Sequence, residues 1–203
     1  MSLNYTYLAL GDSYTVGEGV PLYESYPCQA VQLLRNSGKK FCSPEIIART
    51  GWTTSELALY LDHTLLNTPY DFVSLLIGVN NQYRGMSSSH YAIEFEELLM
   101  RSLSFAGNQA SKIVVLSIPD WGLTPFAGSL DKAFINRDIE IYNDINRSIT
   151  SKYHANYIDI TTGSPETAED LSYLAADGLH PSGKAYKRWA MLLAESINMH
   201  IDK

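Results

Sequence analysis

The sequence has little of what would indicate a metal centre, a disulfide framework or a membrane span. Its 203 residues include two cysteines, Cys28 and Cys42, whose spacing fits no zinc site. Two thiols are too few for a disulfide framework, so we expect both to be reduced. No run approaches the roughly 18 consecutive apolar residues that a membrane span needs, so membrane insertion is not expected.

The N-terminal segment lacks the features of a secretory signal. It has no basic n-region and no small-residue cleavage site before the first apolar run. As it stands, the sequence therefore predicts a cytoplasmic protein. A secreted or periplasmic location is expected only if Met1, Ser2 and Leu3 replace a leader that has been removed.

Charged residues are few, and the excess is acidic. They make up 18% of the chain, and 15 basic against 22 acidic residues give a net charge of −7. Without a basic stripe, nucleic-acid binding is not expected, and an acidic protein gains nothing from an anionic membrane surface. The apolar share of 45% excludes a disordered tail, a coiled coil and collagen. The length predicts one domain over residues 1–203.

Five short apolar runs predict β-strands. They are rich in β-branched, leucine or aromatic residues and are bordered by turn residues. Several are apolar at consecutive positions, which is typical of parallel strands covered on both faces. The runs are Tyr5–Leu10, Glu45–Ala48, Phe72–Ile77, Ile113–Ile118 and Tyr157–Ile160.

Longer segments with helical spacing of apolar residues alternate with these runs. One of them opens with a capping-box pattern, Thr53 followed three residues later by Glu56. The segments are Pro27–Asn36, Thr53–His63, Tyr91–Phe105, Lys132–Tyr153 and Ser182–Met199. Alternating strands and helices predict a three-layer α/β/α sandwich around a five-stranded parallel sheet. In such sheets ligands bind beyond the carboxyl ends of the strands, so that rim is where chemistry is expected.

A glycine-rich segment with Ser13 follows the first expected strand. It reads G-D-S-Y-T-V-G-E-G over Gly11–Gly19. A serine one residue past a strand exposes its hydroxyl where backbone N–H groups can face an anion. Two other interpretations are a turn capped by Ser13 and a phosphate cradle. The cradle is disfavoured because the glycines do not fit G-x-G-x-x-G and no Walker lysine follows.

Gly51, Asn80 and Arg84 follow the second and third expected strands. Gly51 either serves a turn that needs a positive φ or offers a bare backbone N–H to a ligand oxygen. Asn80 and the adjacent Asn81 either make Asx turns or present an amide donor to a developing oxyanion. Arg84 is either a solvated loop charge or a contact for a polar substrate.

Three large apolar side chains, Trp121, Leu123 and Phe126, follow the fourth expected strand. They either form the wall of a pocket or pack the loop locally. Arg84 and Trp121 are therefore the candidate substrate-binding residues.

Asp177 and His180 precede the last expected helix in the run D-G-L-H-P. A carboxylate bonded to Nδ1 of a histidine fixes the tautomer and leaves Nε2 free to face a nucleophile. Pro181 favours the start of a helix and stiffens the segment. The alternative is an Asx turn followed by a histidine at a helix start.

These residues all project to one rim, and together they indicate a serine hydrolase. Ser13 would be the nucleophile, His180 the base and Asp177 the residue that orients it, with oxyanion donors from the neighbouring loops. Independent turns rarely supply all of these groups. Metal hydrolysis is disfavoured because the sequence has no H-E-x-x-H and no clustered cysteine or histidine.

The ordered motifs resemble those of the SGNH hydrolases, also called the GDSL esterase/lipase family. They are G-D-S at 11–13, the glycine after the second strand, G-x-N at 78–80 and D-x-x-H-P at 177–181. The resemblance covers essentially the whole chain and implies a flavodoxin-like α/β/α fold. The ordinary α/β-hydrolase motif G-x-S-x-G is absent.

The resemblance also implies roles for individual residues. It assigns the nucleophile to Ser13, the base to His180 and the orienting acid to Asp177. It assigns the oxyanion hole to the Ser13 N–H, the Gly51 N–H and the Asn80 side chain. One departure is visible: the third motif usually reads G-x-N-D, and here Asn81 replaces the acid.

The sequence therefore predicts an esterase that works through an acyl-enzyme on a small-molecule ester, without cofactor or metal. No extra lid segment is apparent, which favours a shallow site and short acyl groups, acetyl especially. A lysophospholipase or thioesterase of the same family is the first alternative. A non-catalytic flavodoxin-like binding module would use the Gly11–Gly19 loop for a phosphate or flavin but leaves D-x-x-H unexplained. An inactive relative kept as a partner-binding scaffold is the remaining alternative.

Overall fold

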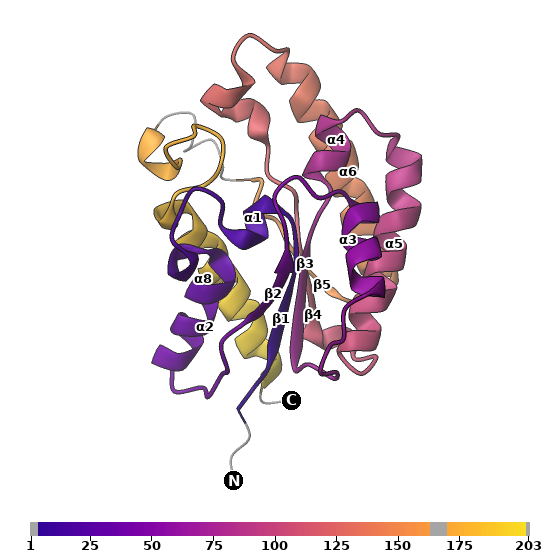
Figure 1. Cartoon of the computed structure of the whole chain (residues 1–203), viewed down its shortest axis with the longest axis vertical. Helices are drawn as coiled ribbons and strands as arrows, with labels where there is room; N and C mark the ends of the chain where they lie inside the picture. Colours follow the sequence, from indigo (N-terminus) through magenta and orange to yellow (C-terminus); the bar gives the residue numbers. More distant parts are fainter. Residues whose placement is uncertain (1–3, 163–169, 202–203) are drawn as a thin grey trace.

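The computed structural model describes residues 4–162 and 170–201 and contains a five-stranded parallel sheet (Figure 1). The strand order is β2-β1-β3-β4-β5, and every neighbouring pair runs parallel. This is the predicted α/β/α architecture with flavodoxin-like strand order. The strands are β1 (Tyr7–Gly11), β2 (Glu45–Ala48), β3 (Phe72–Leu76), β4 (Ile113–Leu116) and β5 (Asn156–Ile158).

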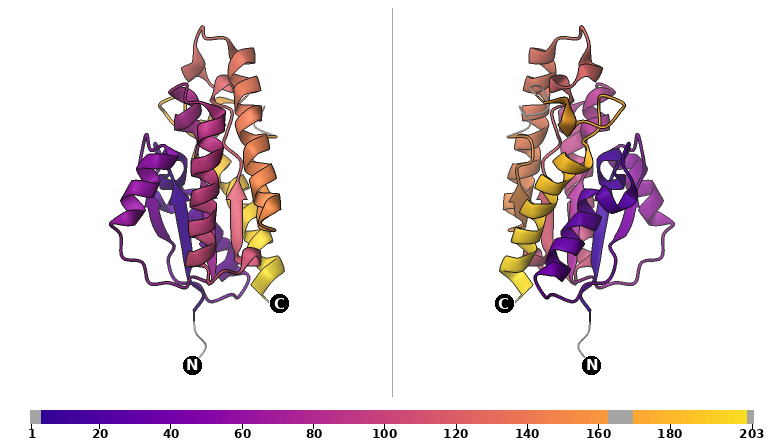
Figure 2. Two further views of the ribbon diagram at one scale, coloured as in Figure 1. Left: turned by 90° about the vertical axis from the view of Figure 1, so that its right-hand side faces the viewer. Right: turned by 90° about the vertical axis from the view of Figure 1, so that its left-hand side faces the viewer.

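Two layers of helices cover the sheet. Figure 2 shows α5 beside α6 in one view and α2 beside α8 in the other. One layer consists of α2 (Tyr26–Asn36) and α8 (Gly183–Ile201), and the other of α3 (Thr54–Asp62), α5 (Ser88–Phe105) and α6 (Lys132–Lys152). All five predicted helical segments are confirmed with shifts of a few residues at their ends. Among the described helices, none has the length and apolarity that crossing a bilayer requires.

The central strands carry the hydrophobic core. Every residue of β1, β3 and β4 is buried, whereas the edge strands β2 and β5 are only partly buried. Because helices cover both faces, consecutive side chains such as Leu8, Ala9 and Leu10 are all excluded from water. Each fully buried aliphatic side chain contributes about 1.5–3 kcal/mol relative to its exposed state.

The capping box at the start of α3 forms as predicted. The backbone N–H of Thr53 donates to Oε2 of Glu56 at 2.8 Å, and the N–H of Glu56 donates to Oγ1 of Thr53 at 3.4 Å. A cap of this kind is worth about 1 kcal/mol. It fixes the first turn of α3, which follows the loop that carries Gly51.

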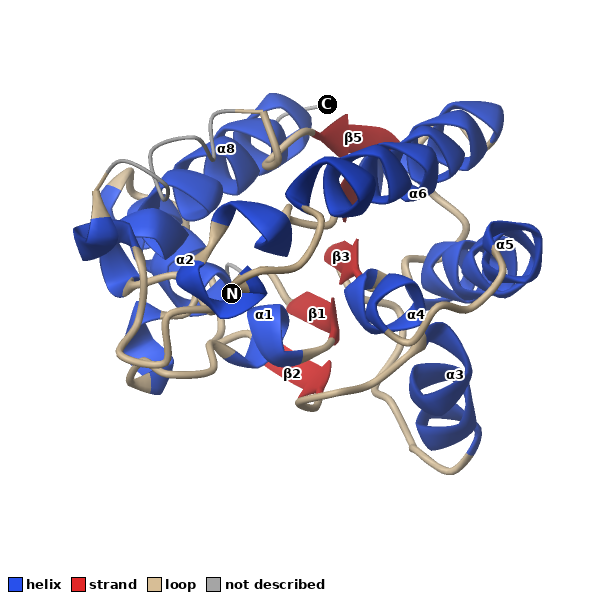
Figure 3. Ribbon diagram, turned by 90° about the horizontal axis from the view of Figure 1, so that it is seen from above, coloured by secondary structure: helices blue, strands red, loops and turns tan. Residues whose placement is uncertain are grey.

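Short elements that the sequence patterns did not predict complete the rim above the sheet. Figure 3 looks down on this rim and shows α1 beside β1 and α4 beside β3. The chain turns in opposite directions from β1 and β3, and this topological switch is where such sheets bind ligands. The short elements at the rim are α1 (Ser13–Val16), α4 (Val79–Tyr83), η1 (Leu22–Glu24), η3 (Trp121–Leu123), η4 (Pro125–Ala127) and η5 (Leu171–Tyr173). A further short element, η2 (Ala110–Lys112), directly precedes β4 and therefore lies at the opposite end of the sheet.

Candidate active site

Ser13 lies at the first position of α1, immediately beyond the end of β1. The side chain of Asp12 caps this helix by accepting the N–H of Tyr14 at 3.0 Å. The sharp turn needs a glycine at position 11, because a Cβ there would lie 2.1 Å from Oγ1 of Thr15 and 2.4 Å from the Leu76 carbonyl oxygen. The Ser13 side chain is thereby held at the rim, on the segment where the sequence analysis predicts it.

His180 meets Ser13 across 167 residues of chain. Its Nε2 lies 3.0 Å from Oγ of Ser13, and its Nδ1 lies 2.7 Å from Oδ2 of Asp177. A carboxylate partner makes Nδ1 the protonated nitrogen, so Nε2 is left to accept the serine proton. Ser13 is 4% exposed and His180 is 7% exposed. The three side chains therefore form a continuous serine–histidine–aspartate line. Ser13 and His180 are largely excluded from water, whereas the Asp177 side chain is 39% exposed.

Asp177 is held in its charged form by its hydrogen bonds. Its Oδ1 accepts the backbone N–H groups of Leu179 and His180, both at 2.9 Å. Burial opposes ionisation, but the bond to the His180 ring and these two N–H bonds outweigh it, and the pKa of Asp177 falls below its ordinary value. An ionised Asp177 can stabilise the imidazolium that forms when His180 takes a proton.

Aromatic side chains pack around the His180 ring and help to fix its position. The ring of Tyr14 packs 5.3 Å from the His180 ring, centroid to centroid, and 6.1 Å from that of Trp189 on α8. The His180 carbonyl also accepts the N–H of Ala175 at 2.8 Å. The imidazole is thus fixed by packing as well as by Asp177. Tyr14 was missed as a site residue, although its position directly after Ser13 was a signal for it.

The two other expected oxyanion donors lie in the same cleft as Ser13. Gly51 has a φ of +84°, as expected for a turn that requires glycine. Asn80 lies in the first turn of α4 and donates from Nδ2 to the Trp52 carbonyl at 2.9 Å. This bond uses one of the two amide hydrogens and leaves the other for a ligand oxygen. The structure therefore brings Ser13, Gly51 and Asn80 together.

The cleft has a volume of about 140 Å³ and is walled largely by apolar groups. Its aromatic wall consists of Trp121, Tyr83 and Phe126, with the Tyr83 ring edge-on to Trp121 at 5.3 Å. Trp121 is fixed by a 2.8 Å hydrogen bond from Nε1 to Oε1 of Gln82. The lining residues are Ser13, Tyr14, Thr50, Gly51, Val79, Asn80, Tyr83, Trp121, Phe126, Leu179 and His180.

The positions of Tyr83 and Leu123 relative to the cleft differ from those that the sequence predicts. Tyr83 was not among the candidate site residues, yet its side chain lines the cleft and is 55% exposed. Leu123 does not line the cleft with Trp121 and Phe126, and instead faces a separate polar cavity beside Asp120 and Asn136. Because η3 is a 3₁₀ turn with three residues per turn, side chains two positions apart point to different sides.

Arg84 lies just outside the residues that line the cleft. Its Nη2 donates to the Gly51 carbonyl at 2.6 Å, and its Nη1 lies 3.4 Å from Oε1 of Glu56. The guanidinium therefore faces the backbone of the loop that carries Gly51.

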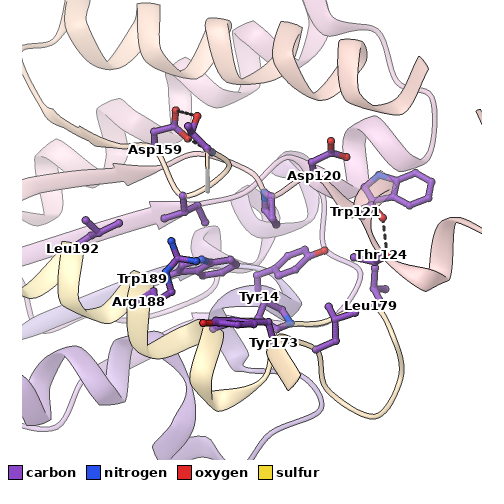
Figure 4. Close-up of a pocket in the computed structure, with 16 residues that line it drawn as sticks. Tyr14, Asp120, Trp121, Thr124, Asp159, Tyr173, Leu179, Arg188, Trp189 and Leu192 are labelled. Atoms are coloured by element: carbon purple, nitrogen blue, oxygen red, sulfur yellow. Dashed lines mark hydrogen bonds between the residues drawn. The ribbon is translucent and has the colours of Figure 1, made fainter. Parts of the chain in front are cut away.

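A second, smaller pocket lies next to the cleft (Figure 4). It has a volume of about 60 Å³ and shares Tyr14, Trp121 and Leu179 with the cleft. These three side chains form a wall between the two spaces, which we call the inner wall. The inner wall closes the cleft on the side that faces this pocket.

This fold with an ordered serine–histidine–aspartate line at the switch point defines the SGNH class of α/β proteins. The model of the GDSL-like lipase/acylhydrolase family matches residues 9–188, and the chain belongs to that family. No curated protein sequence matches the chain.

Several solved structures have a similar fold. The psychrotrophic esterase EstA from Pseudoalteromonas sp. superposes with a TM-score of 0.73 at 18% identity, covering 98% of this chain and 100% of that one. The acetylxylan esterase Axe2 from Geobacillus stearothermophilus gives 0.72 at 17%, covering 97% and 96%. A lipase/acylhydrolase from Enterococcus faecalis gives 0.72 at 18%, covering 96% of each chain. At these identities the similarity shows the fold.

Proposed function

We propose that this protein is a carboxylic ester hydrolase that works through an acyl-enzyme on Ser13. The observation that carries the proposal is the distance of 3.0 Å between Oγ of Ser13 and Nε2 of His180, with Asp177 at 2.7 Å behind the ring. Membership of the GDSL-like lipase/acylhydrolase family supports the same reaction class.

In the acylation step, Nε2 of His180 takes the Ser13 proton as Oγ attacks the ester carbonyl carbon. The carbonyl oxygen becomes a tetrahedral oxyanion, for which the donors are the N–H groups of Ser13 and Gly51 and the Asn80 amide. The imidazolium then gives its proton to the departing alcohol, and the C–O bond of the ester breaks.

Deacylation repeats these steps with water in place of the hydroxyl. His180 takes a proton from water, the resulting hydroxide attacks the acyl carbon, and the acid leaves as the proton returns to Ser13. Asp177 keeps the imidazole in one tautomer and stabilises its charged form throughout.

Short acyl groups, acetyl especially, are the proposed substrates. A cleft of about 140 Å³ is close to the volume that holds one benzene molecule, and the inner wall closes it on one side. The description of one structural neighbour as an acetylxylan esterase supports the same choice. Lysophospholipids and thioesters are the alternatives, since the same chemistry hydrolyses them.

The test combines active-site labelling with hydrolysis. A fluorophosphonate should label the purified protein at one serine, identified by peptide mass, and Ser13→Ala should lose both the label and the hydrolysis of p-nitrophenyl acetate. Ser89→Ala is the matched control, because Ser89 is an exposed residue in the first turn of α5 and its hydroxyl bonds to that of Ser87. Absence of labelling and of hydrolysis across an ester panel with the folded wild-type protein would overturn the proposal.

A further inference from the structure

The loop with Gly51 and the helix with Asn80 are connected by a set of side-chain hydrogen bonds. Asn80 donates to the Trp52 carbonyl at 2.9 Å, and Arg84 donates to the Gly51 carbonyl at 2.6 Å. Both donors belong to α4 and its C-cap, and both acceptors belong to the turn after β2. Asn80 and Arg84 are four residues apart, so they lie on the same side of this short helix.

Arg84 bonds to the very residue that is expected to supply an oxyanion donor. Its Nη2 bond to the Gly51 carbonyl is short and charge-assisted, and such bonds are stronger than neutral ones. Its Nη1 lies 3.4 Å from Glu56, whose carboxylate is itself fixed to the backbone of Thr53 at 2.8 Å. The planar guanidinium therefore joins the Gly51 carbonyl to the capped first turn of α3.

Among the side-chain bonds to this turn, the Arg84 bond acts on Gly51 directly. Others act on its neighbours: the Thr50 hydroxyl donates to Glu18, and Asn80 donates to the Trp52 carbonyl. Gly51 carries no side chain, and its positive φ belongs to the third position of a turn that closes through a 3.2 Å bond from the Trp52 N–H to the Arg49 carbonyl. A glycine has more backbone freedom than any other residue, so this turn depends on outside contacts for its position.

We infer that Arg84 is a positioning residue, which fixes Gly51 relative to Asn80 so that both can donate to one oxyanion. This inference rests on the proposed esterase function. An oxyanion hole works only when its donors are already in place before charge develops, since reorganisation during the reaction would cost part of the stabilisation. Arg84 is not among the residues that line the cleft with Ser13, and it acts through the Gly51 carbonyl.

The experiment compares Arg84→Ala with Arg101→Ala in the hydrolysis of p-nitrophenyl acetate. Arg101 is a matched control: it also lies beside α3, donating to the Ala58 carbonyl at 3.1 Å and pairing with Asp62 at 2.9 Å, but outside the cleft. Arg84→Ala should lower kcat by about 10- to 100-fold with little change in KM, because misplaced donors weaken transition-state binding. Arg101→Ala should keep the wild-type kcat.

Two further measurements separate positioning from general damage to the fold. Added guanidinium at millimolar concentration should restore part of the kcat of Arg84→Ala, because it can occupy the vacated site between Gly51 and Glu56. Arg84→Lys keeps the charge but not the planar fork, so it should retain an intermediate kcat. Both variants should unfold in urea as cooperatively as the wild type.

The outcomes distinguish this inference from the proposed function. Failure of the wild-type protein to hydrolyse esters would overturn both. An active wild type with an unchanged kcat in Arg84→Ala would overturn the positioning role alone. A raised KM with unchanged kcat in Arg84→Ala would do so too, and would assign Arg84 to substrate binding. If Arg84→Ala fails to fold, Arg84→Lys provides the test. A kcat of Arg84→Lys equal to that of the wild type would also reject the inference.

Discussion

Asn81 holds Thr54 with both ends of its side-chain amide. Oδ1 of Asn81 accepts the Thr54 N–H at 3.1 Å, and Nδ2 donates to Oγ1 of Thr54 at 2.6 Å. The Thr54 hydroxyl in turn donates to the carboxylate of Glu94. A hydroxyl has one proton, so with that proton on Glu94 it can only accept from residue 81. At position 81 the family motif usually has an acid, which cannot donate when ionised. Asparagine suits this position because its Nδ2 can donate to the Thr54 hydroxyl, whose proton is used by Glu94 on α5.

Asn81→Asp is expected to destabilise the protein. The new carboxylate and Glu94 would compete for the single Thr54 proton, and one buried oxygen would lose its donor. The free energy of unfolding, measured by urea titration at neutral pH, should fall by about 1–3 kcal/mol. Adding Glu94→Gln should recover part of this loss, because a glutamine amide can donate to Thr54 and free its proton for the new carboxylate. Strictly additive effects in this double-mutant cycle would contradict the network.

The Asn80 amide should contribute to catalysis and not to substrate binding. Its free hydrogen would bond to an oxygen that becomes charged only in the transition state. Asn80→Ala should therefore lower kcat by roughly 10²–10³, with KM nearly unchanged. Steady-state kinetics with p-nitrophenyl acetate measures both constants. A change confined to KM would instead make Asn80 a ground-state binding residue.

The bond from Asn80 to the Trp52 carbonyl needs its own control, because the alanine variant removes that contact too. Thermal unfolding should report the structural part of the effect, which is about 1 kcal/mol for an ordinary hydrogen bond. A loss of activity much larger than this value, with the folded state intact, belongs to the oxyanion role.

The main features of the fold were predictable because their causes are local. Strands buried on both faces must be apolar at consecutive positions, and β1, β3 and β4 show this pattern. The Thr53 capping box likewise acts within four residues. The convergence of Ser13 and His180 was predictable too, since β1 ends and the last helix begins at the same rim of a parallel sheet.

The features that were not predicted depend on long side chains and on short elements. Residues 78–85 have turn-like composition, so α4 was not expected. Without a helix at these positions, there was no reason to place the side chains of Asn80 and Arg84 on the same side. The Arg84 side chain reaches back 33 residues to Gly51, a contact that no sequence spacing encodes. The direction of Leu123 depends on a single 3₁₀ turn, whose pitch the apolar pattern does not reveal.

Asp12 should make the stability of the protein depend on pH. Its carboxyl group is fully buried, and burial raises its pKa from 3.8 to about 7, although the bond from the Tyr14 N–H opposes the rise. The folded state therefore binds this proton more tightly than the unfolded state does. Stability from Asp12 is fully present below about pH 4 and is lost as pH rises to about 7, by an amount on the order of 4 kcal/mol.

Asp12→Asn should remove this dependence, because the amide is neutral at every pH. The variant's unfolding free energy minus that of the wild type should rise between about pH 4 and pH 7 and stay level above it. Subtraction cancels the titration of other groups. Asp177, whose pKa is lowered, affects stability only at lower pH, as its carboxylate becomes protonated. A difference that stays constant with pH would show that Asp12 is charged in the folded protein.

Acyl-chain length is the property that the shape of the cleft should control. The inner wall of Tyr14, Trp121 and Leu179 separates the cleft from the pocket behind it. A methylene gains about 0.8 kcal/mol only when it is buried, so acyl carbons that leave the cleft gain almost nothing. For p-nitrophenyl esters from acetate to dodecanoate, kept below their micelle concentrations, kcat/KM should peak at acetate or propionate and fall by octanoate.

Tyr14→Ala tests whether the inner wall sets this limit. Removing the ring would join the cleft to the pocket drawn in Figure 4 and provide apolar surface for more methylenes. Because Tyr14 also packs on His180, all esters should react more slowly, and the informative quantity is the ratio of kcat/KM for hexanoate and acetate. That ratio should rise in Tyr14→Ala and stay at the wild-type value in Tyr14→Phe, which keeps the ring. A wild-type maximum at octanoate or beyond would instead indicate that the exposed rings of Tyr83 and Phe126 border a groove for long chains, and a lysophospholipase or lipase would then replace the short-chain esterase.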